Sequence, residues 1–542
     1  MNYLIKSKNL LTLAFLTTLL LSCKENLLNP LPNDRISTAI FWKTETDALL
    51  AANAAYVYLP GHSTFTINNV TKLYSVFAFD GVTDIGHTNQ PFNVNSFIES
   101  GSYDASNSRV TDEWEIAYTG IATVNDFMEN VDRVTTTNTA LIERLKGEMR
   151  FLRAYHYVNL ASLYGGVPIV TKTLSTEEAK QLKRDDIQKV WDFATSELTA
   201  AAAVLPATYP ASDKGRITKG AALALLARAN LYAGRFQQAA KAASEVMKLG
   251  YDLYPNYGKL FTYAAENNVE VILDHQYVNS SGLSNNVFAQ MAPYSQKTAN
   301  NTFVPTKTLA DAFTMKNGLP ITDPASGYDP RNPYKDRDPR MGFTMFLSGD
   351  PLPSGATFRP EPNSGTTDAV GNTYLATTTG YVLKKYINSE DFGTPGVSGI
   401  NIILIRYAEV LLTYTEAKIE LNQLDQSVYD AINKVRNGRQ DVKLPSIAMG
   451  RSQAELREIV RHERMVEFAF EGLRLFDIRR WKTAEKVMPG SIYGMTWVNN
   501  GNLSTIQVQA FERVFKPNRD YLWPIPQKEL DLNPGLTQNP GW

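Results

Sequence analysis

Apolar residues recur every three or four positions over long stretches of this chain, which is the spacing of amphipathic helices. In residues 141–166, Leu145, Met149 and Leu152 lie on one stripe, which predicts a helix packed along that stripe. Gly165 follows the stripe and is typical of a helix end. The same periodicity predicts helices in residues 41–59, 113–131, 186–204, 218–233, 236–249 and 403–437.

Several of these segments pair into helix hairpins. Residues 218–249 form two amphipathic segments around a short glycine-containing turn, with Ala227 in the first and Ala239 in the second. Such small residues let two helix backbones approach closely. Residues 407–439 repeat the plan with Asn422 at the turn, and the spacing resembles a tetratricopeptide hairpin of about 34 residues. Because one hairpin cannot bury its faces alone, we expect roughly four to stack.

The character of the sequence changes between residues 251 and 400. Pro, Gly, Asn, Ser and Thr accumulate there, and residues 269–278 and 380–387 are short strand-like runs. Long irregular connections inside a compact protein are usually functional. The predicted fold class is therefore mostly α, a scaffold of helix hairpins that carries a large loop-rich insertion.

The first residues are typical of a secretory leader. Lys6 and Lys8 precede an apolar run over residues 10–21, which is too short to cross a bilayer as a helix. The run ends at Cys23, the only cysteine in the chain, in a sequence that resembles the lipobox of bacterial lipoproteins. That resemblance implies removal of residues 1–22 and acylation of Cys23. An ordinary secretory signal with a chance cysteine is the alternative.

Composition excludes little beyond nucleic-acid binding. The 542 residues carry 54 Lys and Arg against 55 Asp and Glu, for a formal net charge of −1. This balance gives no general attraction to nucleic acid or to anionic membranes. One cysteine cannot form an internal disulfide, so burial and hydrogen bonds must stabilise the fold.

Five segments together resemble the SusD/RagB family of surface nutrient-binding lipoproteins of Bacteroidota. They occur in the family's order and are residues 41–56, 150–170, 405–422, 461–482 and 521–542. The resemblance implies an α-α superhelix without catalytic activity that caps a TonB-dependent outer-membrane transporter of the SusC type. It also implies a lipid-anchored protein on the cell exterior that delivers oligosaccharide or polysaccharide to that transporter. A peptide cargo, as in RagB-like lids, is the alternative within the family.

The chain is expected to be one compact unit in three parts. Residues 1–22 are the leader, and residues 23–250 are the N-terminal region that contains the helix pairs. Residues 251–542 hold the loop-rich insertion and the closing helices. A scaffold of helix hairpins without any small ligand is a third functional hypothesis.

Residues 461–481 contain a possible catalytic pair. Glu467 and Glu471 are four residues apart and would share a helix face if the helix continued to Gly472, and paired carboxylates are the usual equipment of glycosidases. The neighbouring arginines favour ionised carboxylates, however, which works against a general acid. A structural network of ion pairs is the preferred interpretation. It comprises Arg461, Arg464, Glu467, Glu471, Arg474, Asp477, Arg479 and Arg480.

Two loops have the composition of a glycan site, residues 77–104 and 277–295. Sugars present C–H faces that lie on aromatic rings and hydroxyls that need fixed polar partners. Each aromatic residue could instead pack into the small core of its own loop. The candidate ligand-binding residues are His87, Asn89, Phe92, Phe97, Tyr103, Tyr277, Asn285, Phe288 and Tyr294.

No metal or cofactor is expected. The five histidines are scattered without the pairwise spacing of zinc ligands, and no phosphate-binding or dinucleotide-binding motif is present. Asp336 and Asp338 lie close together but lack the other positions of a calcium loop. The sequence thus favours a binding protein that works through shape, rings and hydrogen bonds.

Overall fold

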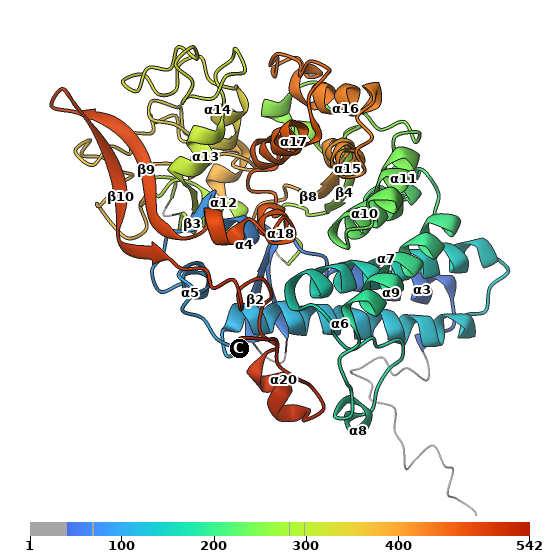
Figure 1. Cartoon of the computed structure of the whole chain (residues 1–542). Coiled ribbons are helices and arrows are strands. Elements are labelled where there is room, and N and C mark those ends of the chain that lie inside the picture. Colours follow the sequence, from blue (N-terminus) through green and yellow to red (C-terminus); the bar gives the residue numbers. More distant parts are fainter. Residues whose placement is uncertain (1–40, 68–69, 281, 298) are drawn as a thin grey trace, which may run out of the picture.

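The computed structural model describes residues 41–67, 70–280, 282–297 and 299–542 (Figure 1). The predicted leader and Cys23 lie outside these residues. The longer helices are α3 Glu45–Tyr56, α6 Ser108–Asn130, α7 Thr139–Tyr164, α9 Ile187–Val204, α10 Lys219–Tyr232, α11 Phe236–Val246, α15 Tyr407–Glu420, α16 Gln426–Asn437 and α17 Gln453–Glu467. The shorter ones are α4 Phe77–Gly81, α5 Val94–Glu99, α8 Thr176–Ala179, α12 Val287–Met291, α13 Lys307–Ala312, α14 Arg340–Thr344, α18 Arg474–Arg480, α19 Ala484–Val487 and α20 Gln527–Leu532.

The strands form small antiparallel pairs. These are β1 His62–Ile67 with β2 Val70–Ser75, β3 Gly86–Thr88 with β5 Phe303–Pro305, β4 Val271–His275 with β8 Ile402–Arg406, β6 Met345–Phe346 with β7 Val382–Leu383, and β9 Gly490–Asn499 with β10 Asn502–Arg513. No sheet of the described chain has more than two strands, so the helices provide the scaffold.

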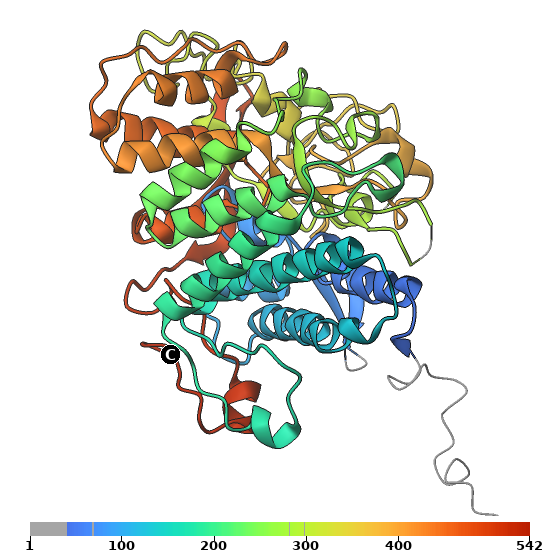
Figure 2. The ribbon, with the colours of Figure 1, turned by 90° about the vertical axis from the view of Figure 1, so that its right-hand side faces the viewer.

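The helices stack in sequence order, as Figures 1 and 2 show from two sides. α6 packs on α7, α7 on α9, α9 on α10, α10 on α11, and α11 on α15, which also contacts α16 and α17. Gly234 and Asn422 occupy the two predicted turns with φ angles of +73° and +56°. Ala227 and Ala239 are both buried between helices. The predicted stack of helix hairpins is confirmed.

Gly120 sets how closely α6 and α7 approach. A Cβ atom at this position would lie 2.3 Å from Nε2 of His156 on α7, well inside van der Waals contact. Both ring nitrogens of His156 are buried, and neither has a hydrogen-bond partner among the described residues. Burial lowers the pKa of His156 to about 4, so the ring is neutral at physiological pH. The histidine therefore acts here as a packing residue.

Two details of the helix prediction were wrong. Residues 402–406 form strand β8 instead of the start of a helix, because β-branched isoleucines dominate them and they pair with β4. Helix α17 ends at Glu467 and does not continue to Gly472. Phe470 has a φ of +59° and Gly472 a φ of +81°, conformations that an α-helix cannot contain.

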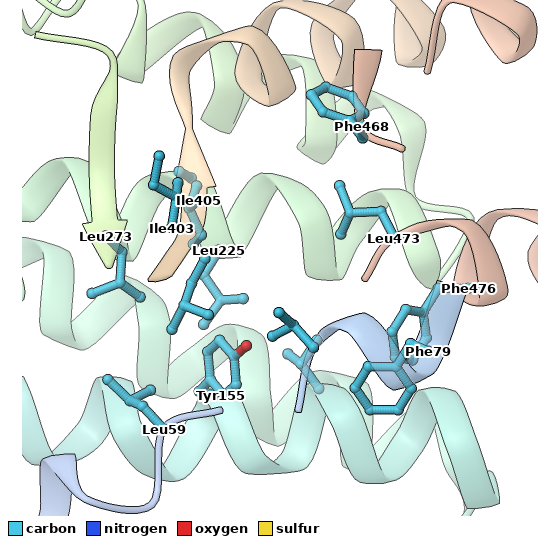
Figure 3. Close-up of a cluster of buried hydrophobic side chains, with 14 of the residues drawn as sticks. Leu59, Phe79, Tyr155, Leu225, Leu273, Ile403, Ile405, Phe468, Leu473 and Phe476 are labelled. Carbon is cyan, nitrogen blue, oxygen red and sulfur yellow. The ribbon is translucent and has the colours of Figure 1, made fainter. Parts of the chain in front are cut away.

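One hydrophobic core joins distant parts of the chain. Figure 3 shows Leu59, from the loop after α3, and Tyr155 on α7 in one cluster with Leu225 on α10. Strands β4 and β8 add Leu273 and Ile403 to the same cluster. Side chains from beyond α17 complete it, and those labelled in the figure are Phe468, Leu473 and Phe476. The N-terminal and C-terminal regions thus share buried surface.

The predicted loop-rich insertion is present. Between α11 and β8 the described chain contains only short helices and strands, and in Figure 1 these yellow-green segments gather on one side of the helix stack. The hairpin of β9 and β10 extends along the same side. Within the described residues, no helix combines the length and the apolar character needed to cross a membrane.

Candidate functional site

Glu467 and Glu471 converge on a single buried arginine. Arg406 donates from Nη1 to Glu467 at 2.7 Å and to Glu270 at 2.9 Å, and from Nε to Glu471 at 2.6 Å. Lys385 adds a further ion pair to Glu471 at 2.7 Å. Although the helix ends between the two carboxylates, the fold still brings them together.

Two more guanidinium groups hold Glu467. Arg340 donates to Glu467 at 2.8 Å and to Glu463 at 2.6 Å. Arg439 also lies 2.9 Å from the carboxylate of Glu467. Burial by itself raises the pKa of Glu467, but the three guanidinium groups beside it outweigh burial and hold this pKa well below its usual range. The side chain of Glu467 has no exposed surface.

This geometry contradicts the glycosidase hypothesis for the pair. Burial also raises the pKa of Glu471, and Arg406 and Lys385 outweigh it, so the net shift is again downward. A general acid must hold a proton near neutral pH and reach the substrate. Neither carboxylate does so, because both are ionised and enclosed.

The other arginines of the predicted network bind separate partners. Arg464 contacts Asp477 at 2.8 Å, and Arg474 reaches across to Asp84 at 2.7 Å. Arg480 pairs with Glu416 at 2.5 Å and with Asp477 at 2.8 Å. Together these contacts tie α18 to α17, α15 and the segment after α4.

Arg461 and Arg479 do not take part in the buried ion pairs. Arg461 faces the exposed Glu458 at 3.5 Å, at the surface of α17. Two guanidinium nitrogens of Arg479 have no hydrogen-bond partner among the described residues, and the group lies over the ring of Trp523, with 5.6 Å from the guanidinium carbon to the ring centroid. Its pKa is lowered by burial. Proximity in sequence to the carboxylates was therefore a poor guide to pairing.

Three candidates from the first loop are enclosed within the fold. His87 lies 3.0 Å from Glu99, and Tyr103 packs edge-on against Trp542 with ring centroids 4.7 Å apart. Asn89 is buried and links its loop to residues 376–378, since its amide donates to the carbonyl of Ala376 and its oxygen accepts from the backbone of Thr378, both at 2.8 Å. These side chains support the loop and present almost no surface to a ligand.

The second loop also turns most of its candidates inward. Phe288 is fully buried, and Asn285 donates to the carbonyl of Ile400 at 2.7 Å. Tyr277 stacks on His275 with ring centroids 4.5 Å apart. Tyr294 is half-buried. The structure does not bring these residues together with the first loop's candidates into one open surface.

Three aromatic rings do reach solvent near the Asn89 link. Phe92 is 91% exposed and Phe97 on α5 is 45% exposed, and both were candidates from the sequence. Tyr374 was not a candidate from the sequence. It is 66% exposed and lies two residues before the segment 376–378 to which Asn89 is hydrogen-bonded. Phe92 lies three residues from Asn89 and Tyr374 two residues from Ala376, so the Cα atoms of Phe92 and Tyr374 are at most about 30 Å apart. We call Phe92, Phe97 and Tyr374 the aromatic platform.

A larger hollow elsewhere is less suited to sugars. It has a volume of about 570 Å³ and lies between α6, the α8 segment and α20, with Trp114, Tyr118 and Leu532 among its walls. Two lysines of its lining are already paired, Lys528 with Glu115 at 2.7 Å and Lys172 with Glu178 at 2.6 Å. Its walls are mostly apolar around Trp114, Tyr118 and Leu532, so size alone does not make it the carbohydrate site.

No metal centre emerges from the geometry. Within the described ranges, no three His, Cys, Asp or Glu side chains gather in an arrangement that could hold a metal ion. Asp338 instead binds Arg340 at 2.8 Å, and Asp336 faces Lys316 at 3.7 Å.

Comparison of this sequence with known protein families shows which family it belongs to. Residues 269–542 match the model described as "SusD family", and residues 68–231 match one described as "Starch-binding associating with outer membrane". The chain belongs to the SusD family. This SusD-family chain is also similar to solved structures over nearly its whole length, and its fold class agrees with theirs.

Two of these structures come from Bacteroides fragilis. A SusD-like carbohydrate-binding protein is 31% identical with a TM-score of 0.83 over 92% of this chain and 100% of that one. A second SusD-like protein is 27% identical with a TM-score of 0.79 over 95% and 100%. SusD-like protein P25 of Formosa agariphila is 24% identical over 98% of both chains.

Sequence reasoning missed Tyr374 and a tryptophan of the C-terminal hairpin, Trp497. A signal existed for the hairpin, because Asn500 and Gly501 stand between two alternating segments, the strongest short-range mark of a hairpin turn. Both residues have positive φ, +48° and +82°. For Tyr374 the only signal was a lone ring in a loop rich in Gly, Asn and Thr.

Proposed function

We propose that this protein binds carbohydrate at the aromatic platform and delivers it to a SusC-like TonB-dependent transporter of the outer membrane. In this proposal Cys23 carries the lipid anchor and the platform faces the cell exterior. The protein holds its cargo and leaves it intact. The observation that carries the proposal is the exposure of Phe92 and Tyr374 on two loops that Asn89 ties together.

Exposed rings of this kind offer apolar surface to a ligand. A phenylalanine ring that is 91% exposed buries almost none of its apolar surface in the fold. The apolar C–H face of a sugar covers such a ring while the sugar hydroxyls stay in water. Because Asn89 fixes both loops, little conformational entropy is lost when a ligand bridges them.

The relatives support the same class of ligand. One matched family model is described as starch-binding, and one similar solved protein is described as carbohydrate-binding. Both descriptions concern those proteins, and the platform is the feature of this chain that gives them a physical basis here.

The test is a comparison of binding by platform variants. Phe92→Ala and Tyr374→Ala should each weaken the binding of a neutral oligosaccharide about 2- to 10-fold in calorimetric titration, since each removes one ring contact. Their thermal unfolding should match that of the parent protein because both rings are exposed.

Leu50→Ala on α3 is the matched control, because this apolar side chain is also exposed but lies on the helix stack. It should leave affinity unchanged. Unaltered affinity in both ring variants would refute the platform, and binding of peptides in place of glycans would assign the protein to RagB-like lids.

A further inference from the structure

A second hollow lies beside the C-terminal hairpin, and the function proposed above does not use it. Its volume is about 310 Å³, at the lower end of the range for small-molecule sites. Strand β9 forms one wall through Met495 and Trp497, and the segment around Tyr334 forms another. Ser348 and Glu361 close a third side. We call this space the hairpin hollow.

The walls of the hairpin hollow are anchored at both ends. At the base, the backbone N–H of Met495 donates to the carbonyl of Thr379 at 2.7 Å. A Cβ atom at Gly494 would lie 2.1 Å from that same carbonyl oxygen, so only glycine permits this contact. At the tip, Arg331 donates to the carbonyl of Gly501 at 3.1 Å. The hollow therefore exists before any ligand arrives.

The opposite wall is held by a buried arginine. Arg337 donates to the carbonyl of Pro333 at 2.8 Å, next to Tyr334, and to the carbonyl of Ala310 on α13 at 2.6 Å, which ties this segment to α13. Asn332 donates to Asp329 at 2.6 Å and stands at the rim. The fold thus positions the ring of Tyr334 and the side-chain amide of Asn332.

The lining offers both hydrogen-bond donors and acceptors around two rings. Trp497 and Tyr334 are each half-buried and line the hollow. Arg331 and Lys335 supply cationic donors at the rim. Glu361 accepts from the hydroxyl of Ser348 with one carboxylate oxygen, and no described residue forms a hydrogen bond or ion pair with its other oxygen.

This combination favours hydroxyl-rich, neutral ligands. A hydroxyl group both donates and accepts, so it can satisfy Glu361 and a neighbouring cation at the same time. An anionic ligand that paired with Arg331 or Lys335 would also meet the Glu361 carboxylate. A purely apolar ligand would bury that carboxylate and the cations unpaired. The aromatic walls suit the C–H face of a sugar ring.

We propose that the hairpin hollow is a second carbohydrate-binding site, which takes one or two neutral sugar residues at the end of a chain. The class of ligand rests on the function proposed above, whereas the site itself rests on the geometry of the hollow. The aromatic platform and the hairpin hollow then bind carbohydrate independently, so a substitution that abolishes binding at one site leaves binding at the other unchanged.

Crystals of the protein soaked with laminarihexaose, maltohexaose or xylohexaose test this directly. We expect sugar density against Trp497 with at least one hydroxyl bonded to Glu361.

In calorimetric titration, Trp497→Ala should reduce the number of bound oligosaccharides from two to one. Because Trp497 also packs against the core, Glu361→Ala is the second variant, and it should weaken the hollow site about 5- to 10-fold without unfolding the protein.

Tyr493→Ala is the matched control, since this ring lies on the same strand, is 46% exposed and does not line the hollow. It should change neither the number of bound oligosaccharides nor their affinity. Sugar on the platform with an empty hollow would overturn this inference and leave the proposed function standing. Sugar at neither position, with all three oligosaccharides, would overturn both.

Discussion

At Arg406, five hydrogen bonds reach three glutamates, and none of those glutamates lies within sixty residues of it in sequence. The sequence predicted that arginines near Glu467 and Glu471 form ion pairs, but it could not supply these partners. Charge near a residue in sequence says little about charge near it in space. The same limit applies to the candidate rings, because exposure of Phe92 and burial of Phe288 depend on how each loop folds.

Glu467→Gln tests the structural role of the buried carboxylate. Removing one charge leaves Arg340, Arg406 and Arg439 partly uncompensated inside the protein, so we expect a loss of about 3–5 kcal/mol in the free energy of unfolding. Urea denaturation measures it. Glu458→Gln, an exposed position on the same helix, should cost less than about 1 kcal/mol. Equal stability of both variants would contradict the network.

At the scale of elements, helices were predictable and their joints were not. Helices α3, α6, α7, α9, α10 and α11 begin and end within about five residues of their predicted limits, because their apolar stripes face neighbouring helices. Strand β8 and the end of α17 escaped prediction, since pairing with β4 and a positive φ at Phe470 are tertiary effects. The joint between α4 and α18 is of the same kind.

Asp80 makes that joint and gives it a pH dependence. The backbone N–H groups of Gly472 and Arg474 donate to its carboxylate at 3.0 and 2.9 Å, yet burial raises the pKa of Asp80 to about 7. The folded protein thus keeps this proton up to about pH 7, whereas the unfolded chain releases it near pH 3.8. This group therefore lowers stability by up to roughly 4 kcal/mol as the pH rises from about 4 to about 7.

Asp80→Asn removes this titration. Relative to the parent protein, the variant should gain stability as the pH rises across that interval, as measured by urea denaturation at a series of pH values. Asp430→Asn, an exposed position on α16, should follow the parent profile. A constant difference between Asp80→Asn and the parent would show that Asp80 does not titrate in this range.

At the scale of the molecule, a stack of helix hairpins supports a loop-rich side (Figure 1). The hairpin hollow lies between that side and strand β9, and Tyr374 of the aromatic platform belongs to the same insertion. The sequence predicted this division because helical periodicity stops where Gly, Pro and Asn accumulate. It predicted only part of the candidate site. Phe92 and Phe97 were named, whereas Tyr374 and Trp497 became visible once loop 373–378 and the hairpin were placed.

The most direct measurement is calorimetric titration of the full chain with neutral oligosaccharides and with peptides, followed by mass spectrometry of the recovered ligand. We expect saturable binding of at least one oligosaccharide, no binding of peptides, and a recovered glycan of unchanged length. Binding of peptides alone, or recovery of shortened glycan, would contradict the account of a carbohydrate carrier that leaves its cargo intact.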